Sequence, residues 1–144
     1  MSRILSFARL CILLSICAGF GLGCKKSDVT FDTIPVSGKV TVDGHPVTDG
    51  QVSFIPFDKE QKAGGMCTGK IDVSGGYVLY TDGKDGAPPG RYKVTVTPSM
   101  VPTGGNKMPT MPFNIKYSEA AKTDLIVIVS ATASPGSYDL KLTK

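Results

Sequence analysis

The stretch VSGKVTVDGHPVTDGQVSFIP, residues 36–56, decides the fold class, because apolar or small residues recur at every second position on both sides of a central turn. These residues are Val36, Gly38, Val40 and Val42 before the turn, and Val52 and Phe54 after it. A period of two is typical of a strand that buries one face. Gly44, directly after Asp43, supplies the positive φ angle of a tight hairpin turn. The stretch therefore predicts two antiparallel β-strands.

The same alternation continues to the end of the chain. It indicates a hairpin over residues 70–81, which bends at residues 74–76, and strands at residues 91–97 and 137–142. The inward-facing residues of these last two strands are Tyr92, Val94 and Val96, then Tyr138, Leu140 and Leu142. No window of about 11 residues has a convincing helical period. We therefore expect an all-β domain of seven short strands, folded as a two-sheet β-sandwich.

Two stretches carry specific predictions about burial. The run DLIVIV, residues 124–129, is apolar on both faces and is expected to be a central strand. Cys67 shares one side of its strand with Gly69, Ile71 and Val73. Cys67 is therefore expected to be a core residue rather than a reactive thiol or a metal ligand.

Residues 1–23 have the features of a bacterial export signal. Arg3 and Arg9 supply positive charge near the start, and residues 10–22 carry no charge. As a helix, this uncharged run would be about 20 Å long, which is too short to cross a hydrocarbon core of about 30 Å comfortably. The alternative is a permanent N-terminal membrane helix.

The end of this run, GFGLGCKK (residues 19–26), resembles the lipobox of bacterial lipoproteins, in which a small residue precedes a cysteine. Gly23 and Cys24 match the last two positions of that motif, and Leu22 lies one place later than usual. The resemblance implies that residues 1–23 are removed and that acyl chains such as palmitate are attached to Cys24. An ordinary secreted protein without lipid is the alternative.

After cleavage, residues 24–33 would form a polar tether and residues 34–144 the β-sandwich domain. The full chain has 16 basic and 12 acidic side chains, and two arginines leave with the signal, so 14 basic side chains remain. This near balance, without a clustered basic face, argues against nucleic-acid binding. Lys25 and Lys26 are expected to lie against anionic lipid headgroups and to reinforce the acyl anchor.

Four motifs, in order, resemble the transthyretin-like, carboxypeptidase-regulatory-like domains of bacteria. They are the opening stretch (residues 36–56), DVSGGYVLYT (72–81), GAPPGRYKVTV (86–96) and IKYSEAAKTDLIVIV (115–129). The last motif is similar to the ending of small planctomycete lipoproteins. The resemblance spans about residues 34–142 and implies a seven-stranded prealbumin-like β-sandwich, anchored by lipid to the cell envelope. It also implies a structural or binding module, because domains of this family often have that role.

The sequence contains no evident catalytic constellation. Transthyretin-like folds include 5-hydroxyisourate hydrolases, but those enzymes use several histidines, and this chain has only His45, in a turn. An isopeptide cross-link between Lys39 and Asp139 is a second possibility, but both residues alternate onto polar faces, and the only glutamates, Glu60 and Glu119, fall in loops. We therefore expect that the protein is not an enzyme and holds no cofactor.

Three ligand hypotheses remain weak. Met100 and the methionines of MPTM (residues 108–111) have the soft thioether ligands that Cu(I) prefers. Asp82 and Asp85 could contact Ca²⁺ but lack the spacing of a calcium-binding loop. Sugar binding needs an exposed aromatic platform, for which the candidates are Phe57, Tyr80 and Tyr117. We expect ordinary turns and packing at these positions, and no metal.

Residues 98–122 form a long connection with four prolines and three methionines. A connection of this length is usually functional or disordered. The sequence therefore predicts a non-enzymatic cell-envelope lipoprotein that is bound to a bacterial membrane, lies outside the cytoplasm and acts as a structural or protein-interaction module. The alternative is a carbohydrate- or peptide-binding module that uses residues 98–122. The expected partners are the membrane and an envelope protein or glycan.

Overall fold

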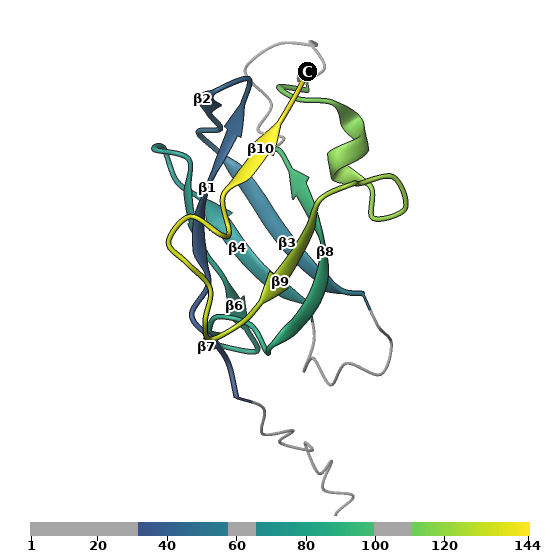
Figure 1. Cartoon of the computed structure of the whole chain (residues 1–144). Helices are drawn as coiled ribbons and strands as arrows, with labels where there is room; N and C mark the ends of the chain where they lie inside the picture. Colours follow the sequence, from purple (N-terminus) through teal and green to yellow (C-terminus); the bar gives the residue numbers. More distant parts are fainter. Residues whose placement is uncertain (1–31, 58–65, 100–110) are drawn as a thin grey trace, which may run out of the picture.

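The computed structural model describes residues 32–57, 66–99 and 111–144, which form an all-β domain with one short 3₁₀ helix (Figure 1). The strands are β1 (Ser37–Val42), β2 (His45–Pro46), β3 (Gly50–Pro56), β4 (Cys67–Ile71), β5 (Gly76–Val78), β6 (Tyr80–Thr81), β7 (Lys84–Asp85), β8 (Gly90–Thr97), β9 (Ile126–Val129) and β10 (Leu140–Leu142). The 3₁₀ helix η1 spans Ile115–Ser118. The prediction of an all-β domain is confirmed.

The predicted number of seven strands is wrong, because the described residues contain ten. The turn at Asp43 and Gly44, with φ angles of 48° and 86°, folds β2 back onto β1 as an additional strand. The predicted strand at the end of the 70–81 hairpin is divided at Leu79. Leu79 donates its N–H to the carbonyl of Val36, so β5 pairs with β1, whereas β6 pairs with β4 and β7.

The strands form one continuous sheet in the order β10-β1-β5-β4-β3-β8-β9. All the neighbours pair antiparallel except β1 and β10, which are parallel. The sheet curls, so that β9 and β10, which stand at opposite ends of the strand order, both lie in front of β3 in Figure 1. The curl encloses an apolar interior.

Most of the core consists of residues that the alternation placed inward. Val36, Val40, Val52 and Phe54 are fully buried, as are Tyr92, Val94 and Val96. The Phe54 ring centroid lies 5.7 Å from that of Tyr92 and 6.4 Å from that of Tyr77. Tyr138, Leu140 and Leu142 are also buried, and Cys67 is fully buried, which confirms its assignment to the core.

Two burial predictions are wrong. Strand β9 lies at the end of the sheet order and is not central. Val127 and Val129 point inward, whereas Ile126 and Ile128 are 52% and 65% exposed. Val73 is 83% exposed, because the strand ends at Ile71 and Val73 already belongs to the following turn.

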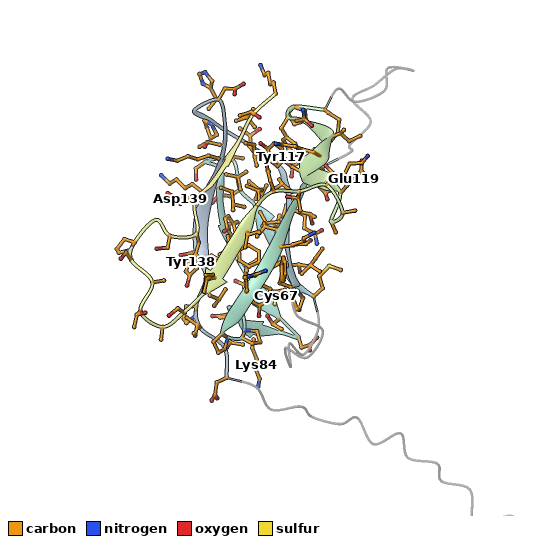
Figure 2. The ribbon with its side chains drawn as sticks, turned by 45° about the vertical axis from the view of Figure 1, so that its right-hand side comes forward. Cys67, Lys84, Tyr117, Glu119, Tyr138 and Asp139 are labelled. Atoms are coloured by element: carbon orange, nitrogen blue, oxygen red, sulfur yellow. The ribbon has the colours of Figure 1, made fainter. Side chains whose placement is uncertain are left out.

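The connection at residues 98–122 is described at both of its ends, and residues 100–110, with Met100 and Met108, lie outside the described part. After this gap, Phe113 and Tyr117 are buried, and their ring centroids are 6.4 Å apart. The Ser118 hydroxyl donates to the carbonyl of Val96 at 3.0 Å. Figure 2 shows Tyr117 and Glu119 beside this helical turn. The end of the connection therefore packs against the core.

The described chain begins at one end of the domain, near β7 (Figure 1). Ile34 forms an isolated bridge with Ala87, close to the start of β8. The predicted export signal (residues 1–23), Cys24 and most of the predicted tether (residues 24–31) lie outside the described residues. In the described part of the chain, no helix is long and apolar enough to span a membrane.

Candidate functional site

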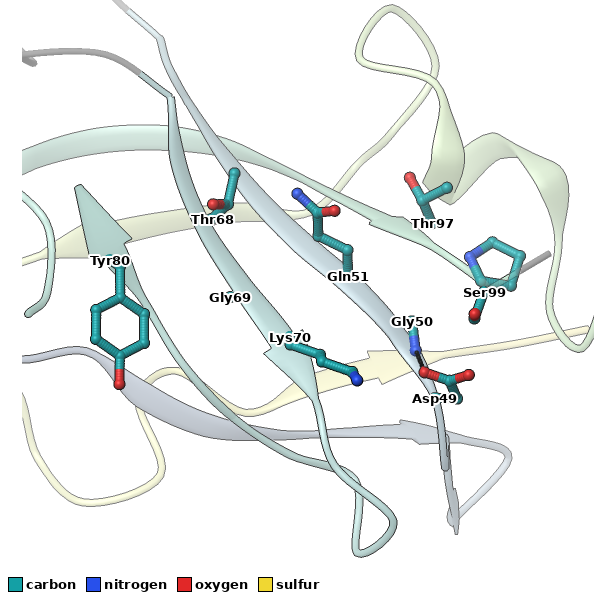
Figure 3. Close-up of a pocket in the computed structure, with 10 residues that line it drawn as sticks. Asp49, Gly50, Gln51, Thr68, Gly69, Lys70, Tyr80, Thr97 and Ser99 are labelled. Atoms are coloured by element: carbon teal, nitrogen blue, oxygen red, sulfur yellow. Dashed lines mark hydrogen bonds between the residues drawn. The ribbon is translucent and has the colours of Figure 1, made fainter. Parts of the chain in front are cut away.

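The described residues enclose a hollow of about 500 Å³ on the outer face of the sheet, which we call the β3–β4 hollow (Figure 3). It is lined by Asp49, Gly50, Gln51, Thr68, Gly69, Lys70, Tyr80, Thr97, Pro98 and Ser99. The lining comes from four strands and from the first residues of the 98–122 connection. Most of its side chains carry hydrogen-bonding groups.

Strand register explains why these side chains gather. Gln51 of β3 lies opposite Lys70 of β4 on one side and Thr97 of β8 on the other, which places the three in one cross-strand row. Side chains in one row share a face of the sheet and lie within contact range. Thr68 lies opposite Tyr80 in the neighbouring row, which brings the tyrosine to the wall of the hollow.

The corner at Asp49 and Gly50 closes one end of the hollow. The Gly50 N–H donates to the Asp49 carboxylate at 2.8 Å, as drawn in Figure 3. Gly50 has a φ of 141°, and a Cβ placed there would lie 2.6 Å from the carbonyl oxygen of Thr97. Only glycine therefore allows the start of β3 to approach the end of β8 so closely.

The chemistry of the hollow suits recognition of a polar partner. Tyr80 is 49% exposed and offers an aromatic face, while Asp49 and Lys70 supply one carboxylate and one ammonium group. Gln51 and Thr68 add an amide and a hydroxyl group. The open shape and this mixture of donors and acceptors fit a hydroxylated or peptide-like ligand.

The candidate catalytic residues are dispersed. His45 is exposed in β2. Lys39 and Asp139 were the candidates for an isopeptide cross-link. The Asp139 carboxylate accepts a hydrogen bond of 2.9 Å from the backbone N–H of Lys39. Glu119 accepts a hydrogen bond from Lys122 in the exposed segment after η1, and Glu60 lies outside the described residues.

The candidate ligand residues are also separated. Asp82 and Asp85 are exposed; Asp82 lies in the turn between β6 and β7, and Asp85 follows Lys84 in β7. Among the described residues, no three His, Cys, Asp or Glu side chains form a group that could hold a metal ion. Met111 packs against the core. Of the three aromatic platforms, Tyr117 is buried and Phe57 lies under Arg91, which leaves Tyr80 as the aromatic face of the hollow.

A second surface on the outer face has a different character. Arg91 of β8 lies opposite Ile128 of β9, and its carbonyl accepts the N–H of Phe57. In the next row, Lys93 lies between Ile55 of β3 and Ile126 of β9. We call this surface the β8–β9 patch; it comprises Ile55, Phe57, Arg91, Lys93, Ile126 and Ile128.

Sequence reasoning named Tyr80 and the 98–122 connection, which contribute to the hollow, but it missed the rest of the hollow and the patch. The residues of the hollow occupy the polar positions of the alternation, which identified the outer face but not the register that joins β3, β4 and β8. The patch was missed because its two isoleucines were taken as evidence for a central strand. The signal that would have found the patch is the strand order, because it shows that β9 stands at the end of the sheet.

Comparison with known proteins adds no assignment. No protein-family model, curated protein or solved structure matches the chain. Function is therefore inferred from the motifs of the sequence and from the chemistry of the two surfaces.

Proposed function

We propose that the chain is a non-enzymatic lipoprotein of a bacterial cell envelope, tied to a membrane through acylated Cys24. In this proposal, residues 34–144 form a prealbumin-like β-sandwich outside the cytoplasm and act as a structural or protein-interaction module. The N-terminal motifs support the anchor, and the four motifs between residues 36 and 129 support the domain type. The curled all-β sheet is compatible with that type.

One spatial relationship carries the proposal: the chain enters the domain at one end of β8, and the hollow opens at the other. The bridge from Ile34 to Ala87 lies close to Gly90, the first residue of β8. Thr97, the last residue of β8, lines the hollow. An eight-residue strand is about 25 Å long. The hollow therefore lies toward the end of β8 that is remote from the point where the tether enters the domain.

The leading partner is a polar segment of another envelope protein. The hollow is open, and hydrogen-bonding side chains of several strands line it, so an extended polar peptide can contact them. Lys70 and Asp49 offer charges of both signs, which select a partner by complementarity rather than by hydrophobic area.

A carbohydrate ligand is the second candidate, and Tyr80 is the observation that favours it. Its exposed ring stands beside Thr68 on the wall of the hollow. Sugars stack their apolar faces on aromatic rings and use amide, carboxylate and hydroxyl groups for orientation. Gln51 and Asp49 provide such groups elsewhere in the hollow, with Asp49 at the end opposite Tyr80 in Figure 3.

The anchor is tested by membrane fractionation of the full chain and of its Cys24→Ser variant in a bacterial host. We expect the wild type to sediment with membranes and the variant to lose this association. A variant that remains wholly in the membrane fraction would show that acylation of Cys24 is not the tether.

The hollow is tested by cross-linking the tagged full chain in cells. Envelope proteins captured by the wild type should be lost from a Lys70→Ala/Tyr80→Ala variant and retained by Lys141→Ala, a matched change of an exposed lysine on β10. Equal capture by all three proteins would refute recognition through the hollow. Saturable binding of envelope polysaccharide fragments, lost in Tyr80→Ala alone, would favour the carbohydrate candidate.

A further inference from the structure

We propose that the β8–β9 patch rests on the anionic lipid surface of the membrane to which the chain is tied. This inference depends on the proposed anchoring through Cys24 and adds an orientation to it. The domain would lie with the outer face of β8 and β9 against the lipid headgroups, and the tether would only hold it there.

The patch has a column of cations between two columns of apolar side chains. Arg91 and Lys93 follow one another along the outer side of β8, with Ile126 and Ile128 on the β9 side. The Arg91 Cζ atom lies 3.6 Å from the centroid of the Phe57 ring, on the β3 side. The guanidinium group therefore covers an aromatic ring that would otherwise face water more fully.

Acidic neighbours of the patch are already paired. The Asp124 carboxylate, two residues before Ile126, lies 2.7 Å from the Lys116 ammonium group. Glu119 pairs with Lys122 at 2.8 Å. Lys93 Nζ donates to the carbonyl of Ala120, a neutral acceptor, so its charge is not offset. Among the described residues, neither Arg91 nor Lys93 forms an ion pair with a carboxylate, so the patch presents positive charge.

This combination suits the interface of a bilayer. Isoleucine and phenylalanine side chains enter the boundary between headgroups and acyl chains, while arginine and lysine pair with phosphates. Long cationic side chains can keep their apolar stems in that boundary and their charges at the headgroups. The two exposed isoleucines and Phe57 provide the apolar part, and Arg91 and Lys93 provide the charge.

The origin of the chain places the patch near the membrane. Ten residues separate Cys24 from Ile34, and a chain of that length reaches at most about 36 Å. Ile34 bridges Ala87, and Gly90 pairs with Val129, so the tether enters the domain beside the first residues of the patch. A short tether therefore keeps this end close to the bilayer.

The same end also shows which side faces the lipid. Asp82 lies in the turn between β6 and β7, Asp85 follows Lys84 in β7, and Figure 2 places Lys84 at the tip of the domain. With Lys84 between them, the two carboxylates leave these three residues with one net negative charge, which anionic headgroups would repel. The domain is therefore expected to lie on its β8–β9 face rather than to stand on its tip.

A partner strand on the open edge of β9, from a second copy or another protein, is the competing occupant. An added strand would extend the sheet sideways from β9. Arg91 and Lys93 lie one strand further in, on the outer face of β8. A flat anionic surface can contact these two cations and the two isoleucines at the same time. The lipid surface therefore accounts for more of the patch.

The test uses the mature lipidated protein in vesicles of phosphatidylglycerol and phosphatidylcholine. The chain contains no tryptophan, so Ile128→Trp introduces a single reporter on the patch. Val73→Trp is the matched control, because Val73 is exposed in the turn between β4 and β5, far from the patch. Flotation of the vesicles reports the anchor, and quenching of tryptophan emission by brominated lipids reports the patch.

We expect strong quenching for Ile128→Trp, little for Val73→Trp, and loss of the Ile128→Trp quenching when Arg91→Gln and Lys93→Gln are added. High salt should also reduce it, because salt screens exposed charges. If Ile128→Trp and Val73→Trp both float with the vesicles but show equal, weak quenching, the proposed contact between the patch and the lipid is refuted, while the anchor is not. A blue shift of Ile128→Trp emission on self-association in detergent, without quenching by lipid, would instead identify a second copy as the occupant and overturn the proposal. A wild-type protein that fails to float would refute the anchor itself.

Discussion

The phenol of Tyr77 donates a buried hydrogen bond of 2.6 Å to the backbone carbonyl of Tyr138, 61 residues later in the chain. The bond joins β5 to the segment that leads into β10. Burial raises the pKa of the Tyr77 phenol, which keeps it protonated and able to donate. We expect Tyr77→Phe to lower the free energy of unfolding by about 1–3 kcal/mol, because the carbonyl would stay buried without its donor.

Chemical denaturation checks this prediction, with Tyr80→Phe as the control. Tyr80 is half-exposed, so removing its hydroxyl should change stability by no more than about 0.5 kcal/mol. Equal stability of the two variants would mean that the bond to Tyr138 contributes nothing.

Gly38 makes a second contact with the same residue. A Cβ added at Gly38 would lie 2.3 Å from the carbonyl oxygen of Tyr138, and the backbone would have to move. We expect Gly38→Ala to cost about 3 kcal/mol, since overpacking of a tight site has costs of that order. Gly44→Ala should cost only about 1 kcal/mol from its positive φ, because no atom lies within 4 Å of its Cβ position. Thermal unfolding of the two variants gives the comparison, and a reversed order would contradict the close approach of β1 to Tyr138.

The carboxylate of Asp72 should make stability depend on acid. It accepts hydrogen bonds from the Ser74 hydroxyl and from the N–H groups of Ser74 and Gly76, which lower the pKa of Asp72 below its ordinary value of 3.8. A folded-state pKa below the unfolded one gives a contribution that is complete above the unfolded pKa and is lost as the pH falls through the folded one. Asp72→Asn should therefore lose less thermal stability than the wild type between about pH 5 and about pH 2.

The Ser74→Ala variant refines the acid prediction. It removes the hydroxyl donor that lowers the pKa of Asp72 most, so its acid-induced loss of stability should be smaller and should be complete at a higher pH than in the wild type. Identical pH profiles of wild type, Asp72→Asn and Ser74→Ala would rule out this turn as a source of pH dependence.

Cys67 should be unreactive in the folded protein. Its side chain is fully buried, and burial raises the pKa of its thiol. The thiolate that attacks alkylating reagents is therefore scarce and inaccessible at neutral pH. In a mature chain with Cys24→Ser, we expect no labelling by iodoacetamide under native conditions and complete labelling in denaturant. Rapid native labelling would contradict the burial of the β4 strand.

Alternation along the strands was sufficient to predict most of the core. Val40, Phe54 and Val94 are buried because each shares a face with apolar residues two positions away, and that pattern is local. Cys67 followed from the same rule. Gly44 was predicted as a turn residue from Asp43-Gly44 alone, and its φ is positive.

Properties that depend on neighbouring strands could not be predicted in this way. Ile126 and Ile128 read as core residues, because an apolar run contains no information about whether a strand pairs on one edge or on both. The hollow needed the register that sets Gln51 between Lys70 and Thr97, which is a non-local property. The division of one predicted strand at Leu79 likewise depends on its bond to Val36, 43 residues earlier.

The most direct test of the account is the intact mass of the mature protein extracted from membranes, supported by sequencing of its first peptide. We expect a chain that begins at Cys24 and carries the added mass of acyl chains on that residue. A protein that retains residues 1–23, or one that begins at an unmodified residue, would contradict the lipid anchor on which the proposed function depends.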